Sequence, residues 1–349
     1  MNDSPTPQLA SSSIGVPLSI LDLATVRAED GPGAIAQTFS ASVELARAAQ
    51  EWGFHRYWFA EHHNMSTIAS SATAVLIGHV AGKTSRIRVG AGGIMLPNHS
   101  PLVIAEQFGT LETLYPGRID LGLGRAPGGD GAMLRALRRS REDADRFPAD
   151  VAELQAFLGP QQADQEVTAT PGAGTEVPLY ILGSSLFGAQ LAAAMGLPYA
   201  FASHFAPAAL VDAVETYRRD YRASARHPEP YVIAALNVFA ADTEQAAGEL
   251  YRAALRDMIA RLARPGVSLS GADAEALLET PGGRRVQEML RYAAIGSPEG
   301  GERGTLHEQV DSFARLARAD EVIVVSNTPT AAQRFRSYEL LAAALGLGA

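Results

Sequence analysis

Short apolar segments alternate with helix-length segments along the chain, and this alternation constrains the fold more than any other feature. Eight segments read as strands: residues 18–23, 56–60, 87–96, 118–123, 179–182, 199–202, 231–240 and 321–326. They are nearly continuous apolar runs, which is typical of parallel strands that are covered on both faces. Eight such repeats in 349 residues predict the α/β class and a closed (β/α)₈ TIM barrel.

Two connections in this pattern are long. Residues 126–178 follow the fourth strand and residues 241–320 follow the seventh, so we expect insertions at both places. Long loops at the catalytic end of a barrel often form lids, and 264–304 is the candidate lid. We expect residues 1–15 to be a mobile tail and 16–349 to form a single domain.

Composition excludes several classes of function. The net charge of −9 argues against nucleic-acid binding and against binding to anionic membranes. The absence of cysteine removes disulfides, thiolate catalysis and iron–sulfur clusters. An uncharged stretch, 177–211, is divided by prolines, which favours a buried strand–helix–strand unit over a membrane span. We therefore expect a soluble, cytoplasmic protein.

The segment 71–81 is apolar on nearly every side, although an outer barrel helix normally keeps one wet face. A second buried face predicts a two-fold interface between subunits, and hence a homodimer. The alternative is that an insertion of the same chain covers this helix.

The active site of such a barrel lies at the carboxyl ends of its strands. Glu61, His62 and His63 follow the second strand there. Neighbouring residues in an extended segment point to opposite sides, so His62 and His63 are not expected to share a metal ion. No HExxH spacing occurs either, and we expect no metal site. One histidine should face the barrel mouth, unless both are structural.

Glycine occupies positions in the third strand where bulky side chains normally fill a barrel. Gly92 and Gly93 predict a bulge, an unusual backbone or a ligand lying flat against the chain.

Three places could hold a phosphate group. Arg125 follows the fourth strand, although a salt bridge with a nearby carboxylate is the alternative. Gly183, Ser184 and Ser185 open the helix after the fifth strand, where free N–H groups attract anions. The segment 326–329 has similar chemistry after the eighth strand. Barrels usually bind phosphate near strands seven and eight, so the residues alone favour 326–329.

At these residues a resemblance becomes visible. The runs YWFAEHHN (57–64), YILGSS (180–185), EVIVVSN (321–327) and the whole of 86–128 resemble the bacterial-luciferase-like, flavin-dependent oxidoreductases. The resemblance is strong over 16–205, looser over 206–320, and returns at the last strand. It implies a barrel that binds reduced FMN at its mouth and usually forms dimers.

The resemblance also assigns residues. It implies a non-proline cis peptide at Gly92-Gly93 that supports the flavin ring, and an Arg125 contact with the FMN phosphate. It places the phosphate loop at 183–187, which includes Gly183, Ser184, Ser185 and Phe187, and so overrules 326–329. His62 matches the catalytic histidine. Gly124 stands where luciferase has a reactive cysteine, so light emission is not implied.

The implied reaction is a monooxygenation. A separate flavin reductase would deliver reduced FMN, which reacts with O₂ and oxygenates a small organic substrate, with His62 transferring a proton. Two alternatives stay open. The barrel could use an 8-hydroxy-5-deazaflavin for hydride transfer, or it could bind flavin without catalysis.

Overall fold

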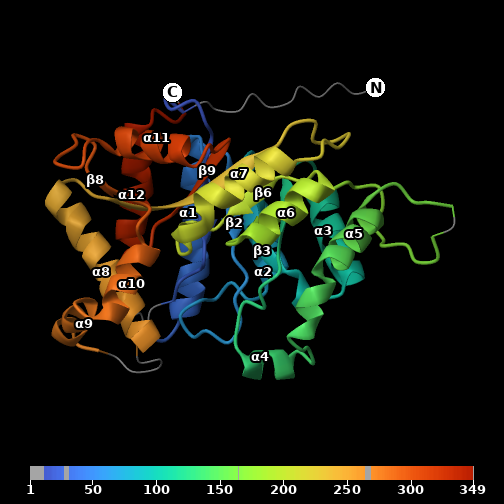
Figure 1. Ribbon diagram of the computed structural model, residues 1–349, viewed down its shortest axis with the longest axis horizontal. Coiled ribbons are helices and arrows are strands. Elements are labelled where there is room, and N and C mark those ends of the chain that lie inside the picture. Colours follow the sequence, from blue (N-terminus) through green and yellow to red (C-terminus); the bar gives the residue numbers. More distant parts are fainter. Residues whose placement is uncertain (1–11, 27–30, 164, 264–268, 349) are drawn as a thin grey trace.

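Eight parallel strands close into a barrel in the computed structural model, which describes residues 12–26, 31–163, 165–263 and 269–348 (Figure 1). Each strand pairs with its sequence neighbour from β1 to β7, and β9 closes the ring between β7 and β1. The barrel strands are β1 (Leu18–Asp22), β2 (Arg56–Phe59), β3 (Arg88–Met95), β4 (Ile119–Gly124), β5 (Leu179–Gly183), β6 (Tyr199–Phe201), β7 (Val232–Ala240) and β9 (Glu321–Val325). The predicted (β/α)₈ barrel is confirmed.

One strand is absent from the sequence-based prediction. β8 (Ala293–Gly296) pairs with the second half of β7, while the first half of β7 pairs with β9. Asn237 is the residue at which β7 changes partner. β8 was missed because four residues, mostly small, carry too little apolar pattern to mark a strand.

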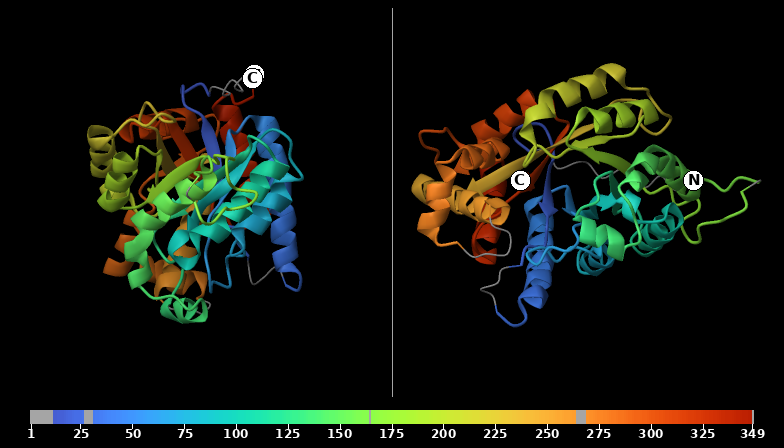
Figure 2. Two further views of the ribbon diagram at one scale, coloured as in Figure 1. Left: turned by 90° about the vertical axis from the view of Figure 1, so that its right-hand side faces the viewer. Right: turned by 60° about the horizontal axis from the view of Figure 1, so that its bottom comes forward.

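Helices surround the strands as an outer layer (Figure 2). They are α1 (Ala34–Trp52), α2 (Thr73–Ala81), α3 (Pro101–Leu114), α4 (Gly131–Ala136), α5 (Phe147–Leu158), α6 (Leu186–Met195), α7 (Leu210–Asp220), α8 (Glu244–Ala263), α9 (Gly271–Leu278), α10 (Pro281–Met289), α11 (Leu306–Leu316) and α12 (Ala331–Ala344). Among the described residues, no helix combines the length and apolar character that crossing a membrane requires.

The strands alternate their side chains between two apolar cores. Val322 and Val324 of β9 face the helices, whereas Ile323 and Val325 face the barrel interior. This period of two, with both faces buried, explains the continuous apolar strands in the sequence.

Charged side chains fill the amino-terminal end of the barrel. Arg56 donates to both carboxylate oxygens of Glu321, at 2.8 and 2.9 Å, and to Asp120 Oδ2 at 2.9 Å. All three residues are at most 3% exposed. The bidentate geometry compensates for the cost of burying these charges and closes the barrel opposite the expected site.

The two long connections contain additional elements. α4 follows β4, and α8, α9, α10 and β8 follow β7; α4 and α9 both lie at the bottom of Figure 1. Within the candidate lid 264–304, residues 264–268 lie outside the described residues. α9 and α10 pack on α8 around a separate apolar cluster that includes Leu250, Ala274 and Val286.

The last residues of the expected tail, 12–15, lie against the rest of the protein. Residues 1–11 lie outside the described residues, but the Ser13 backbone N–H donates to the Leu345 carbonyl at 2.9 Å. Ser12 is buried. Residues 12–15 therefore pack against the end of α12.

The outer face of α2 is uncovered by the rest of the described chain. Leu76, Ile77 and Val80 are buried against the barrel, but Val75 is 71% exposed. The neighbouring α3 adds Leu114, which is 63% exposed. Cover by an insertion of the same chain, the alternative raised above, does not occur among the described residues.

Candidate active site

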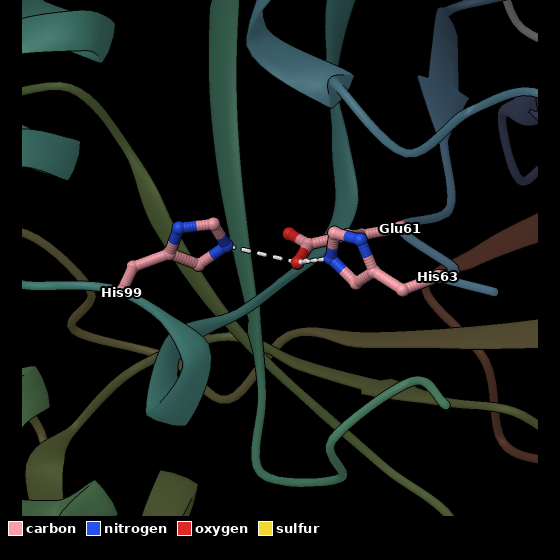
Figure 3. Close-up of side chains that lie close together, drawn as sticks. All are labelled: Glu61, His63 and His99. Carbon is pink, nitrogen blue, oxygen red and sulfur yellow. Dashed lines mark hydrogen bonds and ion pairs between the residues drawn. The ribbon is translucent and has the colours of Figure 1, made fainter. Parts of the chain in front are cut away.

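A buried carboxylate organises the loops after β2 and β3. Glu61 Oε1 accepts hydrogen bonds from His63 Nε2 at 2.7 Å and from His99 Nε2 at 2.8 Å, and all three side chains converge in Figure 3. Glu61 Oε2 accepts from the Met95 backbone N–H at 3.1 Å. His99 was not singled out from the sequence, because its partner lies 38 residues away on another loop.

The segment after β2 is also joined through its backbone to β3 and to the loop after β4. The Glu61 N–H donates to the Gly93 carbonyl at 3.3 Å, and the His63 N–H donates to the Gly128 carbonyl at 2.9 Å. The segments that follow β2, β3 and β4 therefore form one hydrogen-bonded unit. Burial opposes ionisation of Glu61, but the bonds from His63 and His99 outweigh it and lower its pKa to about 2.

His62 stays apart from this cluster, as the alternation of an extended segment predicts. Its Nδ1 is buried and has no hydrogen-bond partner among the described residues. Burial lowers the pKa of His62, although the charge of Glu61 opposes the shift. The lowered pKa favours the neutral form of the His62 imidazole.

A second histidine with a free nitrogen follows β6. His204 Nδ1 is also buried without a partner among the described residues. Burial lowers the pKa of His204 to about 4, and the nearby His62 adds to the shift. No sequence motif marked His204; only its position just after a barrel strand could have drawn attention to it.

Gly92 and Gly93 of β3 show an unusual backbone and a shift in strand register, two of the possibilities that the sequence left open. The Gly92-Gly93 peptide is cis, as the resemblance implied, and the register of β3 against β4 shifts between Ala91 and Ile94. A Cβ at Gly92 would lie 2.9 Å from the Leu21 and Trp58 side chains. A Cβ at Gly93 would lie 2.7 Å from the Gly122 carbonyl oxygen. Close packing inside the barrel therefore requires glycine at both positions.

Arg125 and the loop after β5 come together. The Arg125 guanidinium carbon lies 4.3 Å from the centre of the Phe187 ring. Ser185 is the N-cap of α6, but its side chain makes no capping bond, and Ser184 and Ser185 are exposed. Arg125 also approaches Asp145, at 3.6 Å, so the salt bridge considered above exists. The Arg125 side chain is 42% exposed and that of Asp145 is 80% exposed, so this ion pair stabilises little.

A cavity of about 250 Å³ adjoins this place, and its lining includes Asn98, Arg125, Asp130 and Arg141. Asn98 donates from Nδ2 to the Pro127 carbonyl at 2.8 Å, whereas its Oδ1 is buried without a partner among the described residues. The cavity therefore combines two guanidinium groups with hydrogen-bonding side chains.

The competing phosphate segment after β9 is already bonded internally. Ser326 is buried, its backbone N–H donates to the Tyr338 hydroxyl at 2.9 Å, and its hydroxyl bonds Ser337 at 3.2 Å. Thr330 caps α12 through a reciprocal bond with Gln333. These donors are engaged, in contrast to the uncapped start of α6.

Two curated relatives match almost the whole chain. A luciferase-like monooxygenase of Escherichia coli (strain K12) is 44% identical over 329 residues, covering 93% of this chain and 96% of the relative. The N-acetyl-S-alkylcysteine monooxygenase of Bacillus subtilis (strain 168) is 33% identical over 344 residues, covering 94% and 98%.

Solved structures share the fold. The crystal structure of apo-MsnO8 has a TM-score of 0.84 and 35% identity, covering 95% of this chain and 98% of that one. The oxygenating constituent of 3,6-diketocamphane monooxygenase from Pseudomonas putida, in complex with FMN, has a TM-score of 0.67 at 17% identity, covering 95% and 97%. An F420-dependent secondary alcohol dehydrogenase has a TM-score of 0.65 at 14% identity, covering 95% and 99%.

The family model of the luciferase-like monooxygenases matches residues 16–323, which include every barrel strand except the end of β9. With relatives at 44% and 33% identity over almost the full length, the chain belongs to the luciferase-like monooxygenase family.

Proposed function

We propose that this protein is a flavin-dependent monooxygenase that uses reduced FMN and O₂ to oxidise a small organic substrate. The observation that carries the proposal is the junction of Arg125 with the start of α6. There the Arg125 guanidinium stacks on Phe187 beside the start of α6, where the side chain of the N-cap residue Ser185 makes no capping hydrogen bond. Helix N–H groups, hydroxyls and a guanidinium are the donors that a phosphate monoester prefers.

The residues fit FMN as follows. Arg125, Gly183, Ser184 and Ser185 would hold the phosphate, and Phe187 would keep the guanidinium in place. Gly92 and Gly93 would lie beneath the ring. Side chains are absent there, so the backbone could be approached closely.

Bound reduced FMN would supply two electrons to O₂, so that one oxygen atom enters the substrate and the other leaves as water. His62 would hold or move a proton at Nδ1, which is buried and unpartnered. Because burial favours the neutral form of this imidazole, it can accept a proton. The insertion within 264–304 would exclude water from the reaction.

The assembly that we propose is a homodimer built on the exposed apolar face of α2 and α3. Val75 and Leu114 are large apolar side chains that are exposed to solvent in the single chain. A second copy packed there would bury them.

A deazaflavin enzyme is the competing proposal, because an F420-dependent dehydrogenase shares the fold. That likeness stands at 14% identity, whereas the relatives at 33% and 44% are named monooxygenases. The relatives therefore favour oxygen transfer.

The test supplies the purified protein with a flavin reductase, NADH, FMN, isotopically labelled O₂ and a panel of thioethers. The panel begins with thioethers because the B. subtilis relative is named for an S-alkylcysteine substrate. Peroxide is measured in parallel as the uncoupled product. Labelled oxygen in an organic product supports the proposal. Tight binding of 8-hydroxy-5-deazaflavin with hydride transfer, or flavin binding without turnover of any compound, would overturn it.

A further inference from the structure

We propose that Glu61, His63 and His99 form a binding site for one divalent transition-metal ion, of which Zn²⁺ is the model. This inference is independent of the flavin proposal, because none of the three residues is a proposed FMN ligand. It also reverses the expectation of no metal site, which rested on His62 and His63 and on the absence of HExxH.

The ligand atoms already converge. His63 Nε2 and His99 Nε2 lie 2.7 and 2.8 Å from the same carboxylate oxygen of Glu61, and all three ligand atoms lie within 4.8 Å of one another (Figure 3). Tetrahedral zinc with bonds of about 2.0–2.1 Å separates its ligand atoms by about 3.3 Å. Each imidazole nitrogen would therefore withdraw from Oε1 by about half an ångström, and the two nitrogens would also settle about 3.3 Å from each other.

The sequence positions explain this convergence. Glu61 and His63 are two residues apart in an extended segment, so both point to the same side. His99 approaches from the loop after β3. The Met95 N–H orients the carboxylate through Oε2, as outer groups commonly do at metal sites. The backbone N–H groups of Glu61 and His63 donate to the carbonyls of Gly93 and Gly128. These bonds attach the segment after β2 to β3 and to the loop after β4.

Charge provides the second, independent argument. Every other buried carboxylate among the described residues lies beside an arginine: Asp22 with Arg334, Asp120 with Arg56 and Arg88, Asp150 with Arg146, and Glu321 with Arg56. Glu61 is 1% exposed, and it accepts its hydrogen bonds from two imidazoles and one backbone amide. Buried carboxylates normally lie beside a cation, and at Glu61 a metal ion bound by both imidazoles would supply that charge.

The donor set selects the ion. Two imidazole nitrogens and one carboxylate oxygen suit Zn²⁺ and its neighbours in the first transition row, rather than Mg²⁺ or Ca²⁺. His63 and His99 side chains are 18% and 28% exposed, so an ion can reach them from solvent. Three protein ligands leave a position for water or for another small ligand.

The experiment uses the full-length protein without flavin, stripped with a chelator and dialysed. Calorimetric titration with Zn²⁺ and the absorption spectrum with Co²⁺ report binding directly, and neither depends on turnover. We expect one ion per chain, a tetrahedral Co²⁺ spectrum, and affinity weaker by about tenfold or more in His63→Ala and His99→Ala. His307→Ala is the matched control, because His307 is a partly exposed histidine on α11, in a different connection from the three ligands, and its affinity should equal the wild type.

Two results would overturn the inference. One is the absence of stoichiometric uptake by the wild-type protein, which would leave the cluster as hydrogen bonds alone. The other is uptake that His63→Ala and His99→Ala leave unchanged while circular dichroism shows both variants folded. Flavin binding in the same preparations, measured separately, distinguishes failure of this site from failure of the monooxygenase proposal.

Discussion

The guanidinium of Arg125 stacks on the ring of Phe187, with 4.3 Å between the guanidinium carbon and the ring centre. This contact joins the end of β4 to the first turn of α6, 62 residues later in the chain. A flexible cation is thereby held beside a helix start with unused donors. The stacking keeps the charge in position before any anion arrives.

Replacing Arg125 by alanine should weaken FMN binding. Loss of a charge-assisted contact costs about 1.5–3 kcal/mol, which is roughly a tenfold to hundredfold rise in the dissociation constant. Fluorescence titration with FMN measures it. Arg135→Ala is the control, since Arg135 is exposed on the nearby α4. An unaltered constant in Arg125→Ala would place the phosphate elsewhere.

His62→Ala should leave FMN affinity within about twofold but slow turnover by about a hundredfold, the lower range for loss of a general acid or base. Its Nδ1 is free to act on a bound substrate. Oxygen incorporation measured with a thioether that the wild-type protein oxidises checks the rate, with His307→Ala on α11 as the control. Normal turnover in His62→Ala would remove this residue from the mechanism.

The buried charge cluster at the other end of the barrel should dominate stability. Arg56→Met leaves Glu321 and Asp120 buried with fewer partners, and breaking such a pair costs about 3–5 kcal/mol. Urea unfolding followed by circular dichroism measures the loss. Arg86→Ala, in an ion pair with Glu51 that is about two-thirds exposed on both sides, should change nothing measurable. Equal effects would mean that the buried network adds no stability.

Gly93→Ala should destabilise the barrel by about 1–3 kcal/mol, because its Cβ would meet the backbone oxygen of Gly122. The contrasting variant is Gly248→Ala in α8, where a Cβ meets nothing within 4 Å. That change should stabilise by about 0.5–1 kcal/mol, since alanine favours a helix. Thermal unfolding of both variants decides, and a stable Gly93→Ala would contradict the packing argument.

Val75→Arg should convert the proposed homodimer to a monomer, because it places a charge on the apolar face of α2. Light scattering behind size-exclusion chromatography measures the mass. Val167→Arg also replaces an exposed valine, 47% exposed, but on the connection before β5, and should leave the mass unchanged. A monomeric wild-type protein would refute the dimer, and an intact Val75→Arg dimer would refute this interface.

The fold could be predicted closely because each barrel strand is buried on both faces and so carries its own apolar signature. β4, for example, was expected at 118–123 and spans Ile119–Gly124. β8 could not be found in this way, because it is short and its identity as a strand depends on pairing with β7. Tertiary contact, rather than local pattern, determines it.

From the residues alone, without the resemblance, a cluster of side chains was predictable only where one loop contributes all of them. The Glu61-His62-His63 run was visible in the sequence, whereas His99 joins it from a different loop. The pairing of Arg56 with Glu321 spans 265 positions, and no motif connects such residues. Spatial clusters of this kind depend on barrel closure, which a linear pattern does not encode.

β7 serves two hydrogen-bond ladders in succession, one with β9 and one with β8. β7 is therefore part of the barrel wall and also part of the connection that contains β8. α9 and α10 share one apolar cluster with Phe239 of β7 and Ile295 of β8, so any cover that they form is anchored on β7. Substitutions near Asn237 would consequently disturb two things together: the closure of the barrel by β9 and the position of α9 and α10. Both β9 and these helices lie far from Asn237 along the chain.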